Sequence, residues 1–173
     1  DKGNVIVYSR NGKEIQTFGR FDDMSDLNNI VLDGELLVVD DNKTLDRKTG
    51  NGIINKAIIS DKRKTTVTES EAEMFKIVLW DIIDLKGWLA GHHPEPYKER
   101  LDKLIAMKKD KRYTLVNSQI VNDLDVTCKL FKKMLKEGQE GLILKNINMP
   151  WENKRSYDMV KMKDVQEIDL LIV

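Results

Sequence analysis

Two lysines near the end of the sequence lie two residues apart, in the stretch MVKMK at 159–163. Side chains two apart in a β-strand point to the same face, so the ammonium groups of Lys161 and Lys163 would stand side by side. Neighbouring positive charges repel each other, and an anion such as a phosphate between them removes that repulsion. The spacing is therefore typical either of a solvated strand face or of a phosphate site.

Two glutamates occupy positions where packing does not need a carboxylate. Glu35 interrupts the apolar stretch VLDGELLVVD, and because an unpaired charge away from water is costly, it either faces solvent or has a ligand. We expect Asp33 and Gly34 to form a hairpin turn, with Glu35 on the wet face. Glu140 stands at the mouth of a strand in GQEGLILKN and could hold Mg²⁺, which accepts few protein carboxylates plus phosphate oxygens. For both glutamates the solvated alternative stays open.

An arginine and a tryptophan complete the set of candidate residues. The stretch YSRNGKEI predicts a β-hairpin with Asn11 and Gly12 in a type I′ turn, and Arg10 stands beside that turn. Its planar guanidinium could hold a phosphate or a sugar edge. Trp80 ends the apolar run of FKIVLWDII, where it is either a core residue or a ring on which a nucleobase stacks.

Together these residues predict a nucleoside triphosphate site in which side chains hold the phosphates. The chain has no G-x-x-x-x-G-K-[ST] and no G-x-G-x-x-G motif, so a P-loop or Rossmann cradle is not supported. The adjacent His92 and His93 in LAGHHPEP precede a helix start marked by prolines. For them we favour a solvated loop over metal ligation.

The elements that must position these residues are mainly strands. Apolar and β-branched runs predict strands at 4–9, 30–39, 75–83, 113–116, 141–146, 159–163 and 168–173. A helix is predicted after Pro96, and a second one between Asp123 as N-cap and Gly138 as C-cap. A short helix is expected around 22–29. Because helices and strands do not alternate regularly, the pattern favours an α+β fold with mainly antiparallel sheets and flanking helices.

The segment 40–73 is polar, punctuated by glycines and basic in its middle. It is too long for a simple connector in a compact domain, so we expect it to be functional or mobile.

The composition limits the class of protein. With 173 residues and 40% hydrophobic content, the chain is expected to form one domain with a true core. Its 29 Lys and Arg balance 29 Asp and Glu, so binding to nucleic acid would need a local basic face. Cys128 is the only cysteine, which excludes an internal disulfide and suits a reducing compartment. No run approaches the roughly 20 apolar residues of a membrane span, so we expect a soluble, intracellular protein.

In order along the chain, SRNG, DGEL, FKIVLWDII, EGLILK and VKMK resemble the motifs that follow the nucleophile in ATP-dependent DNA ligases, members of the covalent nucleotidyltransferase superfamily. The stretches NGIINK, DLDVTCK, EGLILKNI, WENKRS and EIDLLIV are most similar to the T-even bacteriophage type of that family. The resemblance covers nearly the whole chain. It implies the nucleotidyltransferase (ATP-grasp-like) core of an adenylation domain.

The resemblance also implies roles in binding the nucleotide. Arg10 matches the arginine that reaches ribose or the nick phosphate, which makes it both a catalytic and a cofactor-binding candidate. Glu35 matches the glutamate that reads the ribose and helps to hold metal. Trp80 matches the aromatic position that stacks on adenine.

For the phosphates and the metal, the resemblance implies three catalytic residues. Glu140 matches the metal-associated glutamate, and Lys161 and Lys163 match the pair that binds the phosphate of AMP. Candidate DNA contacts are Lys56, Lys62, Arg63, Lys64 and Lys145.

The family's nucleophile is a lysine in a K-x-D-G motif, and no such tetrapeptide occurs in the printed sequence. We therefore expect residues 1–173 to be part of an adenylation domain, without the upstream K-x-D-G segment and the downstream oligonucleotide-binding (OB-fold) domain. For the full enzyme the resemblance implies ATP- and Mg²⁺-dependent sealing of 5′-phosphate/3′-hydroxyl nicks through lysyl-AMP and DNA-adenylate.

The expected partner is nicked double-stranded DNA, with no membrane association, and the expected state is a cytoplasmic monomer, in the host cytoplasm if the source is viral. Two alternatives remain open. The first is an RNA ligase or capping-type nucleotidyltransferase of the same superfamily. The second is a non-catalytic module that binds a nucleotide or a nick.

Overall fold

The structure is a computed structural model, and it describes residues 5–24, 27–60, 65–107 and 110–164. The strand expected at 168–173 lies outside these residues, as do three of the candidate DNA contacts, Lys62, Arg63 and Lys64.

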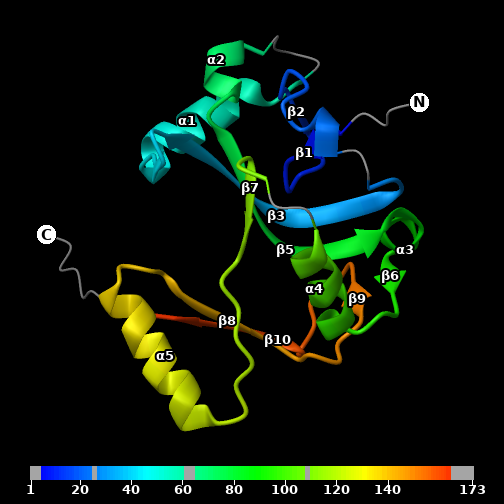
Figure 1. The fold of residues 1–173 in the computed structure, drawn as a ribbon, viewed down its shortest axis with the longest axis vertical. Coiled ribbons are helices and arrows are strands. Elements are labelled where there is room, and N and C mark those ends of the chain that lie inside the picture. Colours follow the sequence, from blue (N-terminus) through cyan, green and yellow to red (C-terminus); the bar gives the residue numbers. More distant parts are fainter. Residues whose placement is uncertain (1–4, 25–26, 61–64, 108–109, 165–173) are drawn as a thin grey trace, which may run out of the picture.

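A four-stranded sheet occupies the centre of the molecule, with the strand order β4-β3-β5-β7 (Figure 1). Its strands are β3 (Ile30–Asp40), β4 (Lys43–Thr44), β5 (Phe75–Asp84) and β7 (Tyr113–Leu115). β3 pairs antiparallel with both β4 and β5, whereas β5 and β7 are parallel. The parallel pair arises because the chain between β5 and β7 makes a crossover through two helices. The fold is thus α+β as predicted, but its central sheet is mixed.

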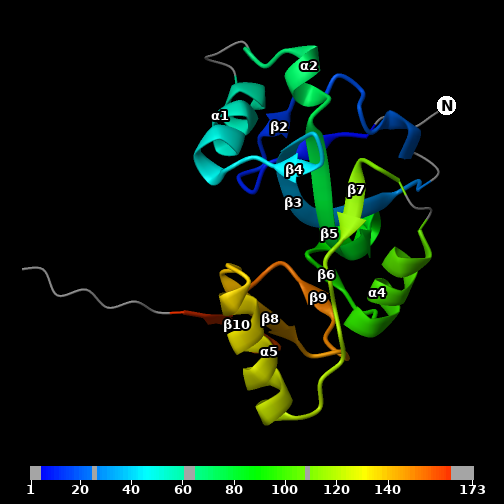
Figure 2. The ribbon, with the colours of Figure 1, turned by 60° about the vertical axis from the view of Figure 1, so that its left-hand side comes forward.

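Three short antiparallel ribbons surround this sheet. They are β1 (Val7–Tyr8) with β2 (Glu14–Ile15), β6 (His92–His93) with β9 (Trp151–Glu152), and β8 (Gly141–Lys145) with β10 (Met159–Lys163). The β8–β10 ribbon and the helix before it lie at the opposite end of the molecule from the β1–β2 hairpin (Figures 1 and 2).

The helices of the described residues are α1 (Arg47–Ala57), α2 (Glu69–Ala72), α3 (Leu85–Ala90), α4 (Tyr97–Ala106) and α5 (Leu124–Lys136), with a 3₁₀ turn η1 at Asp22–Met24. The predictions of α4 and α5 are confirmed, and the Asp123 carboxylate caps α5 by accepting from the backbone N–H of Asp125 and Val126. Of the helix expected around 22–29, the described residues contain only η1.

The segment 40–73 contains two helices, α1 and α2, which its glycines made hard to predict from the sequence. Helix α1 starts where the Asp46 carboxylate accepts from the backbone N–H of Lys48 at 2.9 Å and of Thr49 at 3.0 Å. Thr68 and Glu71 form a capping box at the start of α2. The segment is thus more than a simple connector, as expected, but the sequence analysis did not predict these two helices.

Two apolar clusters fill the core. The first joins the β1–β2 hairpin and α1 to the sheet and contains Ile15, Phe21, Val38, Ile53, Ala57, Val67, Ala72 and Phe75. The second packs α4 against β5 and contains Leu79, Ile82, Leu104 and Tyr113. Each fully buried large apolar side chain contributes about 1.5–3 kcal/mol, so both clusters hold the central sheet between its flanking elements.

A bulge interrupts the pairing of the two long strands. Asp33 pairs with Asp81 and Gly34 with Leu79, so Trp80 is an extra residue on β5. The prediction of a hairpin turn at Asp33 and Gly34 is wrong, because both lie inside β3. Here the glycine serves close approach, since a Cβ at position 34 would lie 2.6 Å from the Val78 carbonyl oxygen.

The β1–β2 hairpin is confirmed, but not its predicted type I′ turn. Such a turn needs positive φ at both central residues, and in this hairpin Gly12 has a φ of 68° while Asn11 is not among the residues with positive φ. The backbone N–H of Gly12 donates to the Ser9 carbonyl at 2.9 Å, and that of Ser9 donates to the Lys13 carbonyl at 2.7 Å. This is the longer three-residue loop, in which a left-handed glycine follows an ordinary turn.

We predict that Gly34→Ala lowers the free energy of unfolding by about 1–3 kcal/mol, because the new methyl group would press on backbone that cannot move independently. Gly52→Ala is the matched control, since position 52 lies in α1 and a methyl group added there would have no other atom within 4 Å. That change should stabilise the protein by about 0.5–1 kcal/mol through helix propensity. Chemical denaturation measures both, and equal effects of the two substitutions would contradict the bulge argument.

Candidate functional site

One face of the central sheet carries the acidic and aromatic candidates. Asp33 and Glu35 lie two apart on β3, so their side chains point to the same face, and both residues are exposed. The bulge places half-buried Trp80 and buried Asp81 opposite Asp33 on β5. Trp80 follows Val78, the partner of Glu35, by two residues on β5, so Trp80 and Glu35 belong to the same region of the sheet.

Beneath this face lies a buried ion pair. Arg100 of α4 is fully buried, and it holds Asp81 with two hydrogen bonds, Nε to Oδ1 at 2.8 Å and Nη2 to Oδ2 at 3.1 Å. The remaining Arg100 nitrogen donates to the carbonyl oxygens of Met149, at 3.2 Å, and of Glu95. A single guanidinium thus fixes β5, the start of α4 and the segment before β9.

Lys145, the last residue of β8, joins the ribbon to this pair. Its ammonium nitrogen lies 4.0 Å from the Asp81 carboxylate and 4.1 Å from the centre of the Tyr97 ring, and its side chain is 12% exposed. Tyr97 in turn donates its hydroxyl to the Trp80 carbonyl at 3.1 Å. The contacts form a continuous connection from the ribbon through Tyr97 and Asp81 to the tryptophan.

Exclusion of water changes the acidity of these groups. Desolvation lowers the pKa of Lys145, and the charges of Asp81 and Asp33 oppose that change. Asp33 is exposed as a residue, but the protein around its carboxyl group partly desolvates it, which raises its pKa. The pKa of Tyr97 rises to about 12, first because of burial and then because of the negative Asp81. In such surroundings charged groups act on a ligand more strongly than in water.

The two lysines of the KxK stretch lie on the β8–β10 ribbon. Lys161 pairs with Ile143, Lys163 with Gly141, and Met159 with Lys145. Directly opposed residues share a face of a two-stranded ribbon, so Lys161 and Lys163 are on the same face as Lys145, which reaches the central sheet. Both are exposed, and neither forms a salt bridge within residues 5–164 as far as these are described.

Gly141 lets the two strands of this ribbon meet beside Glu140. Its φ is 143°, and a Cβ there would lie 2.0 Å from the Met162 carbonyl oxygen. Only glycine fits, so the Glu-Gly pair fixes where the strand that carries the lysines ends. Gly141 therefore does more than separate helix α5 from strand β8, because it permits the close approach of β10.

Both candidate metal ligands line one hollow of about 250 Å³. Glu35 enters it from β3 and Glu140 from the chain before β8, and residues of α1 form much of the remaining wall. Arg47, the first residue of α1, forms an ion pair with Glu140 at 3.0 Å, and both side chains are largely exposed. No group of three His, Cys, Asp or Glu suited to a metal occurs in the described part of the chain. Two carboxylates fit Mg²⁺, which commonly takes one or two together with phosphate oxygens.

Other candidates lie apart from this group. Arg10 is exposed in the turn of the β1–β2 hairpin, and in the described structure it makes no hydrogen bond or ion pair with the other predicted site residues. Lys56 is exposed on α1 and forms an ion pair with Glu71 at 2.8 Å. Lys145 points inward, so its position argues against the direct DNA contact expected for it.

The loop expected for the two histidines is wrong, and only His92 is exposed to solvent as expected. Both residues form β6, and His93 is 12% exposed, with Nδ1 3.0 Å from the Asp84 carboxylate and Nε2 3.3 Å from that of Glu95. His93 therefore has two carboxylate neighbours and a structural position beside the start of α4.

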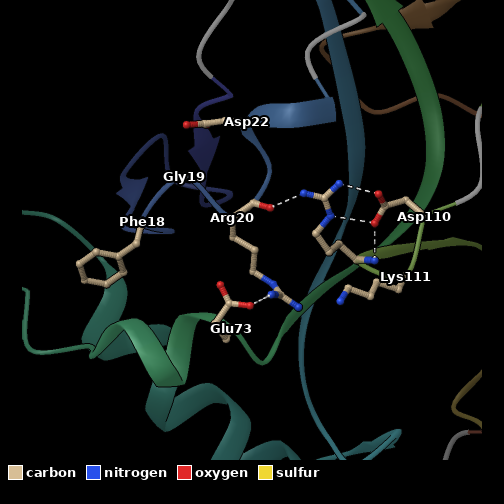
Figure 3. A pocket seen from close by; sticks show the side chains of 8 residues that line it. Phe18, Gly19, Arg20, Asp22, Glu73, Asp110 and Lys111 are labelled. Atoms are coloured by element: carbon tan, nitrogen blue, oxygen red, sulfur yellow. Dashed lines mark hydrogen bonds and ion pairs between the residues drawn. The ribbon is translucent and has the colours of Figure 1, made fainter.

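A second, more open hollow of about 550 Å³ lies at the ends of β5 and β7 (Figure 3). Two ion pairs lie along its wall, Arg20 with Glu73 and Arg112 with Asp110. Arg112 also donates to the Arg20 carbonyl at 2.7 Å, and its guanidinium lowers the pKa of Asp110 to about 2. These contacts fasten the segment before η1 to the sheet, and none of the predicted site residues lines this hollow.

The residues that sequence reasoning missed are Arg47, Asp81, Tyr97 and Arg100. Arg100 left a readable signal, because it falls three residues after Tyr97 and four before Leu104, on the apolar face of the predicted helix. A charged residue on a buried face indicates a buried partner. Arg47 lay in the segment for which no helix was expected.

The fold is similar to that of solved DNA ligases. The structure described as an ATP-dependent DNA ligase from bacteriophage T7 in complex with ATP matches with a TM-score of 0.68 at 21% identity, over 92% of this chain and 56% of that one. A structure from a study titled "DNA binding with a minimal scaffold: Structure-function analysis of Lig E DNA ligases" matches with a TM-score of 0.67 at 16% identity, over 93% and 56%. These matches show that the chain has a fold found in DNA ligases.

The sequence comparisons identify the family. Residues 1–163 match the ATP dependent DNA ligase domain, and the chain belongs to that family. The DNA ligase of Enterobacteria phage T4 is 37% identical over 129 residues, which is 73% of this chain and 26% of that protein. DNA ligase 1 of Korarchaeum cryptofilum is 34% identical over 99 residues, 57% of this chain and 18% of that protein. The chain thus spans about a quarter, or less, of the length of these relatives. No described helix is long and apolar enough to cross a membrane.

We predict that Arg100→Met lowers the free energy of unfolding by about 3–5 kcal/mol, because the buried Asp81 carboxylate loses both guanidinium hydrogen bonds and keeps only the more distant Lys145 as a positive neighbour. Combining it with Asp81→Leu should cost clearly less than the sum of the single changes. The matched control is Lys98→Met on the same helix, whose exposed pair with Asp102 at 2.7 Å should contribute less than about 1 kcal/mol. If Arg100→Met costs no more than this control in urea denaturation, the buried pair does not hold the site together.

Proposed function

We propose that the protein seals 5′-phosphate/3′-hydroxyl nicks in duplex DNA, using ATP and passing through lysyl-AMP and DNA-adenylate. The observation that carries the proposal is the meeting of two elements. Glu35 of the sheet and Glu140, just before the ribbon, line one hollow, and Lys145 holds the ribbon to the sheet. Trp80 lies on the same sheet, and Lys161 and Lys163 lie on the same ribbon face as Lys145. The family and its DNA ligase relatives support DNA as the substrate.

Each side chain has a role that its chemistry allows. The Trp80 ring stacks on adenine, and the Glu35 carboxylate accepts hydrogen bonds from the ribose hydroxyls. Lys161 and Lys163 hold the α-phosphate between two ammonium groups, which relieves their mutual repulsion. Arg10, at the hairpin tip, reaches the ribose or the phosphate at the nick.

Glu35 and Glu140 would hold Mg²⁺, which supplies neutralisation of phosphate charge and orientation of the leaving group. In transfer of a nucleotidyl group the protein mainly positions the reactants and stabilises charge that spreads over the phosphate oxygens. Lys161 and Lys163 can do this directly, because both are exposed on the site face of the ribbon. Arg47 would have to leave Glu140 when a cation binds there.

The nucleophile belongs to the same proposal. The K-x-D-G lysine that becomes adenylated is not among the 173 printed residues, so we infer that it acts from a segment outside them. We also infer that residues 1–173 form part of an ATP-grasp-like adenylation core, used together with an oligonucleotide-binding domain. The protein is proposed to act as a cytoplasmic monomer on nicked duplexes.

We predict that Glu140→Ala and Lys163→Ala each abolish sealing in a protein that contains this chain and the K-x-D-G lysine, because they remove a metal ligand and a phosphate contact. Glu99→Ala and Lys86→Ala are matched controls, exposed on α4 and α3. Conversion of a labelled nick to intact strand measures activity, and circular dichroism checks the fold. Wild-type rates in both site variants would return these residues to the status of solvated surface.

The substrate is tested in the same assay. Nicked DNA and a nicked RNA duplex are supplied separately to the wild-type protein, and we expect faster sealing of DNA. Preference for RNA would favour the RNA ligase alternative. Nucleotide binding without any lysine adduct from labelled ATP would favour a non-catalytic module.

We predict that Trp80→Ala weakens ATP binding by about 1–3 kcal/mol, the range for a base stacked on an aromatic side chain. Trp88→Ala on α3 is the matched control, since Trp88 is 44% exposed and lies outside the proposed site. Isothermal titration with ATP compares the two variants. Unchanged affinity in Trp80→Ala would make the ring a packing residue.

A further inference from the structure

Helix α5 carries a stripe of lysines along one face. Lys129, Lys132, Lys133 and Lys136 follow the spacing i, i+3, i+4, i+7, which places their side chains on one side of a helix. All four residues are exposed. The helix runs through 13 residues, so the stripe from its first to its last lysine spans about 10 Å.

Packing of the helix does not require these lysines. The face toward the ribbon is formed by buried Thr127 and by half-buried Leu130, Phe131, Met134 and Leu135. Within the described residues the stripe forms one ion pair on this helix, between Lys133 and Glu137 at 3.8 Å, and Asp125 lies four residues before Lys129. Like charges three or four apart each cost an isolated helix about 0.2–0.5 kcal/mol, and the four lysines form four such pairs. A helix that only covered the ribbon would be more stable with glutamates among them.

The last lysine of the stripe is close along the chain to the proposed site. Lys136 closes α5 and is followed four positions later by Glu140, which lines the hollow shared with Glu35. In Figures 1 and 2 the helix lies beside the β8–β10 ribbon and runs at an angle to it. Because acidic and basic residues balance in the whole chain, four lysines on one helix face form a local basic surface, the kind that nucleic acid binding requires.

We propose that the lysine stripe of α5 binds the phosphate backbone of duplex DNA beside the nick. Duplex DNA carries one negative charge per roughly 1.7 Å of its axis with both strands counted, so about 10 Å of duplex carries about six phosphates, a density of charge that the four lysines complement. Ammonium groups on flexible stems carry no base-reading geometry, so the stripe positions the duplex without selecting its sequence. The inference rests on the proposed function, and it adds a surface outside the nucleotide site.

The test compares two double variants with the same change of charge. Lys132→Gln with Lys136→Gln removes two stripe lysines, and Lys43→Gln with Lys86→Gln removes two exposed lysines on β4 and α3. Fluorescence anisotropy gives the Kd for a short nicked duplex and for the intact duplex, each over a series of salt concentrations. Isothermal titration gives the affinity for ATP.

For the stripe variant we expect Kd for both duplexes to rise about tenfold, and the slope of log Kd against log salt to fall by about 2, one for each lysine. The control variant should keep most of the wild-type slope, and ATP affinity should not change in either variant. A stripe variant that binds DNA like the wild type, or no worse than the control, would overturn the inference; an acidic protein as partner of α5 would give that outcome. Such a result would leave the proposed function intact. If the wild-type protein bound ATP but not nicked DNA, both the proposed function and the inference about the stripe would be wrong.

Discussion

Arg100 and Asp81 hold opposite charges in a part of the molecule from which water is excluded. Separating such a pair would leave one buried charge without compensation, so the geometry around it has little freedom. The guanidinium also binds the carbonyl oxygens of Glu95 and Met149, and the carboxylate has Lys145 as a second positive neighbour. Arg100 therefore sets the position of α4 and of the chain before β9 relative to β5. Asp81, through Lys145, does the same for the β8–β10 ribbon.

The site depends on this arrangement because its parts come from elements that share few other contacts. Trp80 owes its place to the bulge beside Asp81, and the Tyr97 hydroxyl holds the backbone there. Lys161 and Lys163 stand on a ribbon that Lys145 fastens to the same point. Residues of α1 close the hollow from the other side. A nucleotide bound between sheet and ribbon would add its own contacts to both.

The predictable parts of the fold are those with strong local patterns. The long apolar runs gave β3 and β5, and the apolar periodicity with Asp123 and Gly138 gave α5. Asp33 and Gly34 were misread because an Asp-Gly pair usually turns, whereas here the glycine accommodates the Val78 carbonyl of a neighbouring strand. Helix α1 was missed because glycines at 50 and 52 weaken its propensity, which tertiary packing overrides. Long-range packing of this kind leaves little trace in local sequence.

The sequence was enough to predict which residues have chemistry suited to the site. It was not enough to predict which of them lie close together in the fold. The sequence offers two carboxylates and two lysines with chemistry suited to a metal and a phosphate, and the structure brings Glu35 and Glu140 to one hollow. It does not bring Arg10 into contact with them.

The most direct test is a crystal structure of the protein with AMP bound. We predict the base against Trp80, the ribose beside Glu35 and the phosphate at Lys161 and Lys163; a nucleotide seated elsewhere, such as the hollow around Arg20, would contradict this assignment.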